Sequence, residues 1–268
     1  DDVKYHIEKG IFYKCCDEAA RLAGFLSLKD ALDNYTKEKR KERFSKANGF
    51  ALFIDEINRG NIAAIFGELI TLIEDDKRLG ENEIIVELPY SKEKFGVPPN
   101  LHIIGTMNTA DRSVEALDAA LRRRFSFTEM MSNPDLIRTN GLAPDGKIGD
   151  IDLVEVLHVI NKRIEILLDK DHQIGHSYFL SVAIEDDLKF AFKNKIIPLL
   201  QEYFFGDYGK IGLVLGSGFV ESKPKEINVF AKFSDKYDAS DLADRDVYYF
   251  KDIDGINIQD AIKTLLNN

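Results

Sequence analysis

Two adjacent carboxylates, Asp55 and Glu56, directly follow the apolar run FALFI at positions 50–54. A run that is apolar at every position is typical of a strand buried on both faces of a parallel sheet. Open α/β sheets bind their ligands at the carboxyl ends of such strands. In a phosphate-hydrolysing site the first acid would hold Mg²⁺, directly or through water, and the second would polarise the attacking water. The alternative is a buried strand whose polar end marks only where the chain leaves the sheet.

A second apolar strand is expected at 101–106 (LHIIGT), and it runs into the polar segment MNTADRS. Asn108 would lie at the tip of this strand, where its amide can orient the attacking water or contact a terminal phosphate. A helix expected over 114–121 ends in three consecutive arginines at 122–124. In oligomeric ATPases such a cluster reaches the nucleotide of the neighbouring subunit. By neutralising charge that develops on the terminal phosphate, an arginine of this kind raises the rate of hydrolysis by roughly 10³ to 10⁵.

The strings DEINRGN, MNTADRS and LDAALRRRF, in this order and spacing, resemble the AAA+ motor subunit of the McrB type. This subunit is the GTP-hydrolysing part of modified-cytosine-dependent restriction systems. The string IGHSYF at 174–179 is a further point of similarity, and the resemblance extends from Tyr5 to about Phe205. DEIN alone is shared by many AAA+ proteins, including dynein-like and MoxR-like ones, whereas MNTADRS is more specific.

The resemblance assigns a role to each polar residue at the two strand ends. It implies that Asp55 binds Mg²⁺, directly or through water, and that Glu56 activates the water, as in a Walker B element. It implies that Asn108 contacts the terminal phosphate. Asp111 would help to position Asn108 and the attacking water, although an ion pair with Arg112 that braces the turn is the alternative.

The resemblance also implies an assembly. Arg122 and Arg123 would act on the nucleotide of a neighbouring subunit, in a homo-oligomeric ring that is expected to be a hexamer. The family further implies GTP as substrate, with ATP as the alternative because no residue fixes the base. It implies an endonuclease partner of the McrC type, modified DNA bound through a domain absent from this chain, and the bacterial cytoplasm.

Two further residues have alternative roles. Arg59 follows the acids by three positions, so it either approaches the nucleotide or pairs with Glu56. The segment at 171–179 lies where AAA+ lids often face the nucleotide, and the usual arginine is missing from it. Either His176, with its polar neighbours, contacts base or phosphate, or the segment is a helix cap within the lid.

The sequence contains no phosphate-binding loop of the form GxxxxGKS or GxxxxGKT. In AAA+ proteins this loop precedes the strand that carries the two acids. We therefore expect the chain to be a fragment of a longer subunit and to be inactive alone. The alternatives are a degenerate AAA+ scaffold that does not bind nucleotide, and an ATP-driven remodelling machine of the MoxR or dynein-like kind.

Composition narrows the class of protein. The 268 residues carry a net charge of −10 with a pI of about 5.1, which argues against a DNA-wrapping surface. The two cysteines, Cys15 and Cys16, are adjacent, which favours buried thiols in a reducing compartment over a disulfide or a metal site. No apolar run approaches the length of a membrane span.

The expected fold class is α/β, with a partial AAA+ P-loop NTPase α/β domain, an α-helical lid domain and a small C-terminal α+β appendage. The expected boundaries are 1–131, 132–205 and 206–268. Helices are predicted by apolar spacing at 10–26, 58–76, 152–169, 187–205 (kinked at Pro198) and 258–266. Besides the two strands above, we predict a hairpin within 83–99 and strands at 125–127, 211–216, 228–230 and 247–250.

Overall fold

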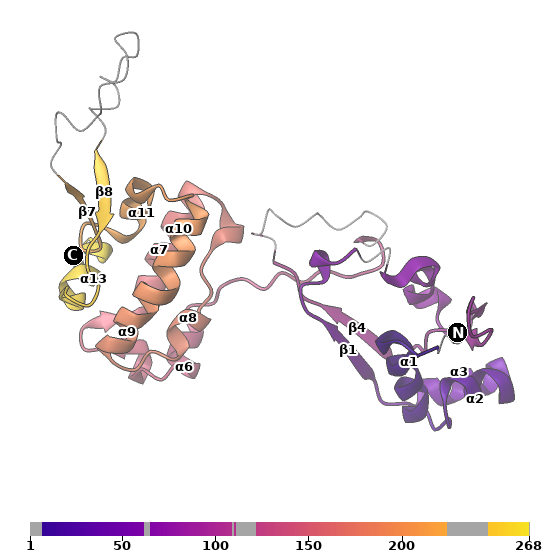
Figure 1. Ribbon diagram of the computed structural model, residues 1–268. Coiled ribbons are helices and arrows are strands. Elements are labelled where there is room, and N and C mark those ends of the chain that lie inside the picture. Colours follow the sequence, from indigo (N-terminus) through magenta and orange to yellow (C-terminus); the bar gives the residue numbers. More distant parts are fainter. Residues whose placement is uncertain (1–6, 62–64, 109, 111–121, 224–245, 268) are drawn as a thin grey trace, which may run out of the picture. The chain divides into compact units, whose positions relative to one another are not determined.

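The computed structural model describes residues 7–61, 65–108, 110, 122–223 and 246–267. The chain divides into two compact units, Asp1–Thr128 and Glu129–Asn268, each with its own hydrophobic core (Figure 1). No helix in the described part of the chain is long and apolar enough to cross a membrane.

The first unit is built on two parallel strands, β1 (Phe50–Ile54) and β4 (Leu101–Gly105). Both predicted strands are confirmed, and they are neighbours in one sheet although a long segment separates them in sequence. Their register runs from Phe50 opposite Leu101 to Ile54 opposite Gly105. Since the pairing is parallel, both carboxyl ends lie at the same edge of the sheet.

Helix α1 (Ile11–Leu22) packs on one face of this sheet (Figure 1). It buries small residues such as Cys16 and Ala20, which allow a close approach to Leu52 of β1. On the opposite face, however, Phe53 is 70% exposed. The expectation that β1 is buried on both faces is therefore wrong for the described residues, because alternate side chains point away from α1 and no described helix covers them.

The remaining elements of the first unit are short: α2 (Leu28–Asn34), α3 (Lys37–Ser45), η1 (Ile57–Arg59), η2 (Gly67–Ile73), η3 (Asp75–Lys77), β2 (Val86–Glu87) and β3 (Lys94–Phe95). Strands β2 and β3 are antiparallel, which confirms the predicted hairpin. The strand predicted at 125–127 is wrong. Phe125 packs instead beside the small apolar cluster of Ile57, Phe66 and Ile73, while Phe127 is exposed.

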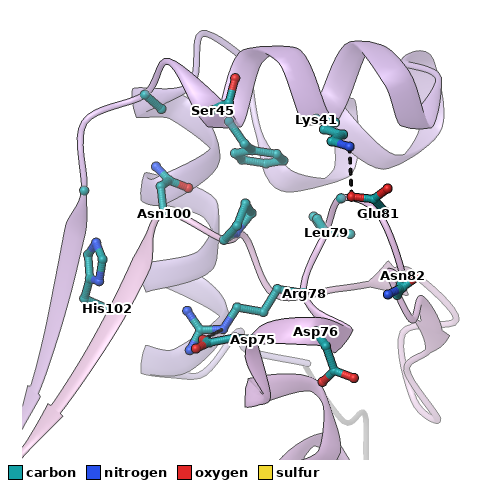
Figure 2. Close-up of a pocket in the computed structure, with 15 residues that line it drawn as sticks. Lys41, Ser45, Asp75, Asp76, Arg78, Leu79, Glu81, Asn82, Asn100 and His102 are labelled. Carbon is teal, nitrogen blue, oxygen red and sulfur yellow. Dashed lines mark hydrogen bonds and ion pairs between the residues drawn. The ribbon is translucent and has the colours of Figure 1, made fainter. Parts of the chain in front are cut away.

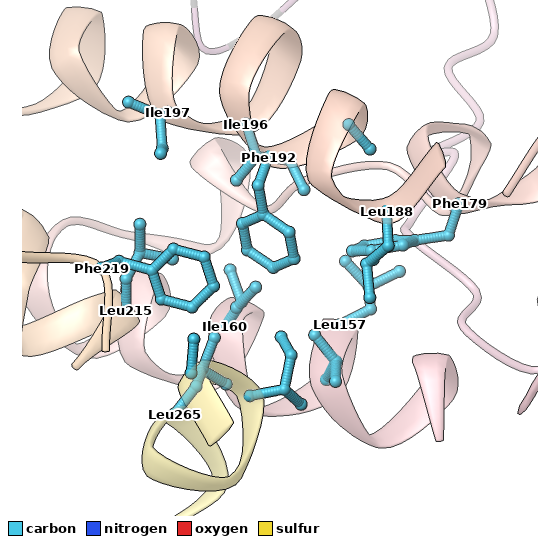
Figure 3. Packing of buried hydrophobic residues seen from close by; sticks show 14 of the residues in the cluster. Leu157, Ile160, Phe179, Leu188, Phe192, Ile196, Ile197, Leu215, Phe219 and Leu265 are labelled. Carbon is cyan, nitrogen blue, oxygen red and sulfur yellow. The ribbon is translucent and has the colours of Figure 1, made fainter. Parts of the chain in front are cut away.

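The second unit is mainly helical and is centred on α7 (Leu153–Leu167). Its other helices are α6 (Leu136–Asn140), α8 (Ser177–Leu180), α9 (Glu185–Ala191), α10 (Ile197–Tyr203), α11 (Tyr208–Leu215) and α13 (Ile258–Leu266), with short antiparallel pairs β5–β6 (Lys147–Ile148, Ile151–Asp152) and β7–β8 (Val220–Lys223, Val247–Phe250). One π-helical turn at 192–196 joins α9 to α10, immediately before the predicted kink at Pro198. Figure 3 shows the core, where Phe192 stacks on Phe219 with ring centroids 4.7 Å apart.

The strand predicted at 211–216 is wrong, because this segment belongs to helix α11. Asp207 caps the helix by accepting a hydrogen bond from the backbone N–H of Lys210 at 3.1 Å. Ile211, Val214 and Leu215 are then buried at helical spacing. They enter the same core as α7 and α13, so the described residues of 206–268 form no core of their own. The strand expected at 228–230 lies outside the described residues.

Candidate functional site

The two acids leave the sheet at the edge where β4 also ends. Because the register pairs Ile54 with Gly105, the next residues along each strand, Asp55 and Thr106, are side by side. The described residues at this edge, from Asp55 and Glu56 on one strand to Asn108 on the other, are exposed. The polar residues that follow the two strands thus lie at one edge of the sheet, and the chemical roles predicted for them stay predictions.

Thr106 joins the two strand ends through its side chain. Its hydroxyl donates a hydrogen bond to Oδ1 of Asp55 and accepts one from the backbone N–H of Glu56 at 3.1 Å. The backbone N–H of Thr106 donates to the carbonyl of Ile54 at 3.0 Å, and its carbonyl accepts from Ile57 at 2.9 Å. Sequence reasoning assigned no role to Thr106. The signal available for it was a hydroxyl residue placed directly after an apolar strand and two positions before Asn108.

Glu56 adopts a left-handed backbone conformation, with φ 50° and ψ 48°. This region is uncommon for a residue with a side chain and often marks a functional turn. The turn brings Ile57 across the end of β4, where a Cβ on Gly105 would lie 2.9 Å from Ile57 Cδ1. A glycine at 105 is therefore needed for this close approach. The local sequence folds the chain so that the Glu56 side chain lies at the sheet edge, about half exposed.

Arg59 pairs with Glu56 in this structure. Its Nε lies 3.1 Å from Oε2 of Glu56, and both side chains are about half exposed. Of the two roles expected for Arg59, the pairing with Glu56 is the one observed. An exposed ion pair of this kind is worth at most about 1 kcal/mol, so it is easily exchanged for a ligand contact.

The side chain of Asn108 is held by a hydrogen bond to the backbone two residues further on. Its Oδ1 accepts a hydrogen bond from the backbone N–H of Ala110 at 3.0 Å. The bonded oxygen orients the amide, and no described residue accepts a hydrogen bond from its Nδ2. Asn108 can therefore offer an N–H donor to an anionic oxygen. Asp111, expected to support Asn108, lies outside the described residues.

The three arginines at 122–124 have different surroundings. Arg124 is largely buried, with its side chain 16% exposed, and its Nη2 lies 2.8 Å from Oε1 of Glu74. Arg122 and Arg123 are exposed, and neither forms an ion pair with any described residue. The structure thus separates an anchored arginine from two arginines that are available to a partner. The predicted action of Arg122 and Arg123 on another subunit stays a prediction.

In the second unit, the loop that carries His176 is fastened by the buried Asn161. Oδ1 of Asn161 accepts from the backbone N–H of Ile174 at 2.7 Å, and Nδ2 donates to the carbonyl of the same residue at 2.9 Å. The hydroxyl of Ser132 donates to that carbonyl as well. The backbone N–H of Asn133 donates to Nδ1 of His176 at 3.3 Å, so the neutral ring carries its proton on Nε2. These bonds fasten the segment within the second unit, but the His176 side chain makes no cap hydrogen bond to α8. A nucleotide contact through Nε2–H stays a prediction.

Replacing Asn161 by Ala is expected to lower the free energy of unfolding by about 2 to 4 kcal/mol, since it leaves the buried N–H of Ile174 without its partner. Urea unfolding followed by circular dichroism measures the change. Asn194→Ala removes an exposed asparagine bonded only to the carbonyl of Phe190, so this matched control should change stability by less than about 0.5 kcal/mol. Equal free energies of unfolding for the two variants would contradict the inferred role of Asn161 in fastening this loop.

A cavity of about 570 Å³ lies at the opposite ends of the two strands (Figure 2). It is lined by residues that precede or begin the strands, such as Gly49, Asn100 and His102, and by the segment around Arg78. Asn100 is 7% exposed, and its Oδ1 has no hydrogen-bond partner among the described residues. Because the two acids are at the carboxyl edge, this cavity is separate from their site.

At the edge of the sheet where β1 and β4 end, the described residues can bind a magnesium ion only together with a nucleotide. No group of three or more acidic, histidine or cysteine side chains that could hold a metal occurs among the described residues. Thr106 occupies Oδ1 of Asp55, while no described residue bonds its Oδ2. One free carboxylate oxygen, supplemented by phosphate oxygens and water, is the donor set that Mg²⁺ commonly takes in phosphoryl-transfer sites.

Comparisons with known proteins match both units. A model of the AAA domain of the dynein-related subfamily matches residues 15–125, and a model of the alpha-helical lid domain of McrB matches residues 152–212. The chain is 36% identical over 221 residues to the type IV methyl-directed restriction enzyme EcoKMcrB subunit of Escherichia coli K12, covering 76% of this chain and 42% of that protein. It is 28% identical over 218 residues to the type II restriction enzyme BsuMI component YdiS of Bacillus subtilis 168, covering 74% and 58%.

Parallel strands with acids at their carboxyl edge, followed by a helical unit, together with the match to the AAA domain, define an AAA+ protein. Within that class, the match of the second unit to the McrB lid and the identity to the McrB subunit show that the chain is of the McrB type. The chain spans about half the length of these curated relatives.

Proposed function

We propose that the full-length protein hydrolyses a nucleoside triphosphate, with GTP as the preferred substrate, as the motor of a DNA restriction complex. The observation that carries this proposal is the placement of Asp55, Glu56 and Asn108 at one edge of two paired parallel strands. The restriction complex is supported by two relatives, one a subunit of a methyl-directed restriction enzyme and the other a component of a type II restriction enzyme.

Each residue at the edge has a distinct chemical task in this proposal. Asp55 would hold Mg²⁺ through its unbonded Oδ2, directly or through water, and the ion would supply positive charge next to the phosphate oxygens. Glu56 exchanges its contact with Arg59 for the attacking water and removes a proton from it. Asn108 donates from Nδ2 to the terminal phosphate or to the water. Asp111 supports Asn108, and Arg59 or His176 adds a further contact to the nucleotide.

The assembly proposed is a homo-oligomeric ring, most simply a hexamer. Arg122 and Arg123 would neutralise charge on the nucleotide bound by the adjacent subunit, and their exposure without described ion pairs supports this role. We further propose an endonuclease partner of the McrC type, recognition of modified DNA by a separate domain, and action in the bacterial cytoplasm. We also propose the domain boundaries that were expected from the sequence, at 131/132 and 205/206.

Hydrolysis of GTP and of ATP by the full-length protein, measured over a range of protein concentrations, tests the proposal. GTP-selective turnover per subunit that rises steeply with concentration is the expected result, because arginines supplied between subunits make a dilute monomer nearly inactive. Turnover that is equal per subunit at all concentrations would contradict the shared site.

The second candidate is an ATP-driven protein-remodelling machine, which the match to the dynein-related AAA domain favours. ATP-selective turnover in the same experiment would support it. No turnover with either nucleotide, in the presence of the endonuclease partner and methylated DNA, would instead support a non-catalytic AAA+ scaffold.

A further inference from the structure

We propose that Thr106 is a positioning residue that holds both acids of the hydrolytic site in their working geometry. This inference rests on the proposed nucleotide hydrolysis and adds to it a residue that contacts neither nucleotide nor water in the reaction. Its basis is that every polar group of Thr106 is bonded to the segment from Ile54 to Ile57.

The hydroxyl of Thr106 acts on Asp55 and Glu56 in different ways. Towards Asp55 it is a donor, so it fixes one carboxylate oxygen and leaves Oδ2 without a bond to any described residue. Towards Glu56 it is an acceptor for the backbone N–H, at 3.1 Å. That bond holds Glu56 at φ 50°, a backbone conformation that a glutamate seldom adopts by itself. One side chain therefore sets the direction of the magnesium ligand and of the base together.

The position of Thr106 also links these acids to Asn108, two residues further along the chain after β4 has ended. The backbone bonds of Thr106 to Ile54 and Ile57 extend the parallel pairing past the last paired residues of the two strands. Because Thr106 is itself exposed, its hydroxyl contributes little to the core. Loss of the hydroxyl should therefore loosen the site without unfolding the protein, since water can replace its hydrogen bonds.

Thr106→Val and Thr106→Ser in the full-length protein test this role. Valine retains the branched shape and lacks the hydroxyl, so we expect kcat for GTP to fall roughly 10- to 100-fold, the effect of losing hydrogen bonds to a charged group. The Mg²⁺ concentration for half-maximal rate should rise, KM for GTP should change little, and serine should restore most of kcat. Thr264→Val makes the same change at an exposed position of α13 and is the matched control.

Mixing subunits separates a loosened active site from a general defect. A Thr106→Val subunit keeps its own arginines, so together with an Arg123→Ala subunit it should recover turnover above either variant alone.

Wild-type kcat and Mg²⁺ dependence for Thr106→Val, alongside an inactive Glu56→Gln variant, would overturn the inference and leave the proposed function intact. Equal losses of activity and melting temperature for valine and serine would show a purely structural role and also overturn it. If Glu56→Gln hydrolyses GTP normally, the assignment of Glu56 as the base fails and this inference fails with it, whereas absence of turnover by the wild-type protein would mean that the proposed function itself fails.

Discussion

Glu56→Gln in the full-length protein is expected to lower nucleotide turnover by roughly 10² to 10⁴, the usual contribution of a general base. The amide keeps the size and the left-handed backbone of the residue, but it cannot take a proton from water. Nucleotide binding should persist, because Asp55, Asn108 and the Thr106 contacts are unchanged. Ring assembly should persist for the same reason. The measurements are steady-state GTP and ATP hydrolysis, nucleotide affinity by fluorescence, and subunit mass by light scattering.

A matched control is Glu42→Gln on helix α3. Glu42 is an exposed glutamate that pairs with Lys46 at 2.8 Å, and its loss should leave turnover and binding unchanged. Unaltered hydrolysis by Glu56→Gln would rule out the assignment of Glu56 as base. Loss of nucleotide binding together with turnover would instead assign Glu56 to binding.

Arg123→Ala is expected to lower turnover by roughly 10³ to 10⁵ if this arginine neutralises charge on a neighbouring nucleotide. Arg123 is exposed and has no ion pair with the described residues, so its removal should cost little stability. Nucleotide affinity of each subunit should also be nearly unchanged, because the residue acts on another subunit's site. Hydrolysis assays and thermal unfolding, compared at equal protein concentration, measure both expectations.

Arg124→Ala provides the contrasting result. This side chain is anchored to Glu74, so its loss should lower the free energy of unfolding by about 1 to 3 kcal/mol. Arg21→Ala, which removes an exposed arginine paired with Asp17 on α1, should change neither property. Subunits with Glu56→Gln and subunits with Arg123→Ala should complement each other when mixed. Absence of complementation, or a binding defect in Arg123→Ala alone, would make Arg123 a residue of its own subunit's structure.

Much of the first unit was predictable from local patterns. The apolar runs at 50–54 and 101–105 are strands, and Asp55, Glu56 and Asn108 follow them at their shared carboxyl edge. Regular apolar spacing likewise predicted α1, α7 and α13. Such patterns are reliable because burial of one face repeats with the period of the element itself.

The errors occurred where a short apolar segment has no distinctive period. Residues 211–216 are a helix because Asp207 caps its start and α7 offers a surface for its buried side, neither of which is visible in the apolar run alone. Residues 125–127 alternate as a strand would, yet Phe125 packs beside a small cluster, and the segment pairs with none of the described strands. The exposure of Phe53 was unpredictable for a similar reason, since the strand pattern does not say which face has a covering helix.

The sequence by itself determined the class of protein, the order of its elements and the residue types that the chemistry requires. Those properties reside in the strings DEINRGN and MNTADRS and in periodic apolar spacing, all of which are local. Only the tertiary structure decided that Thr106 bonds both acids, that Arg59 faces Glu56, and that Arg124 is anchored while Arg122 and Arg123 are exposed. These choices depend on strand register and on contacts between distant segments, such as Glu74 with Arg124, which no local spacing can specify.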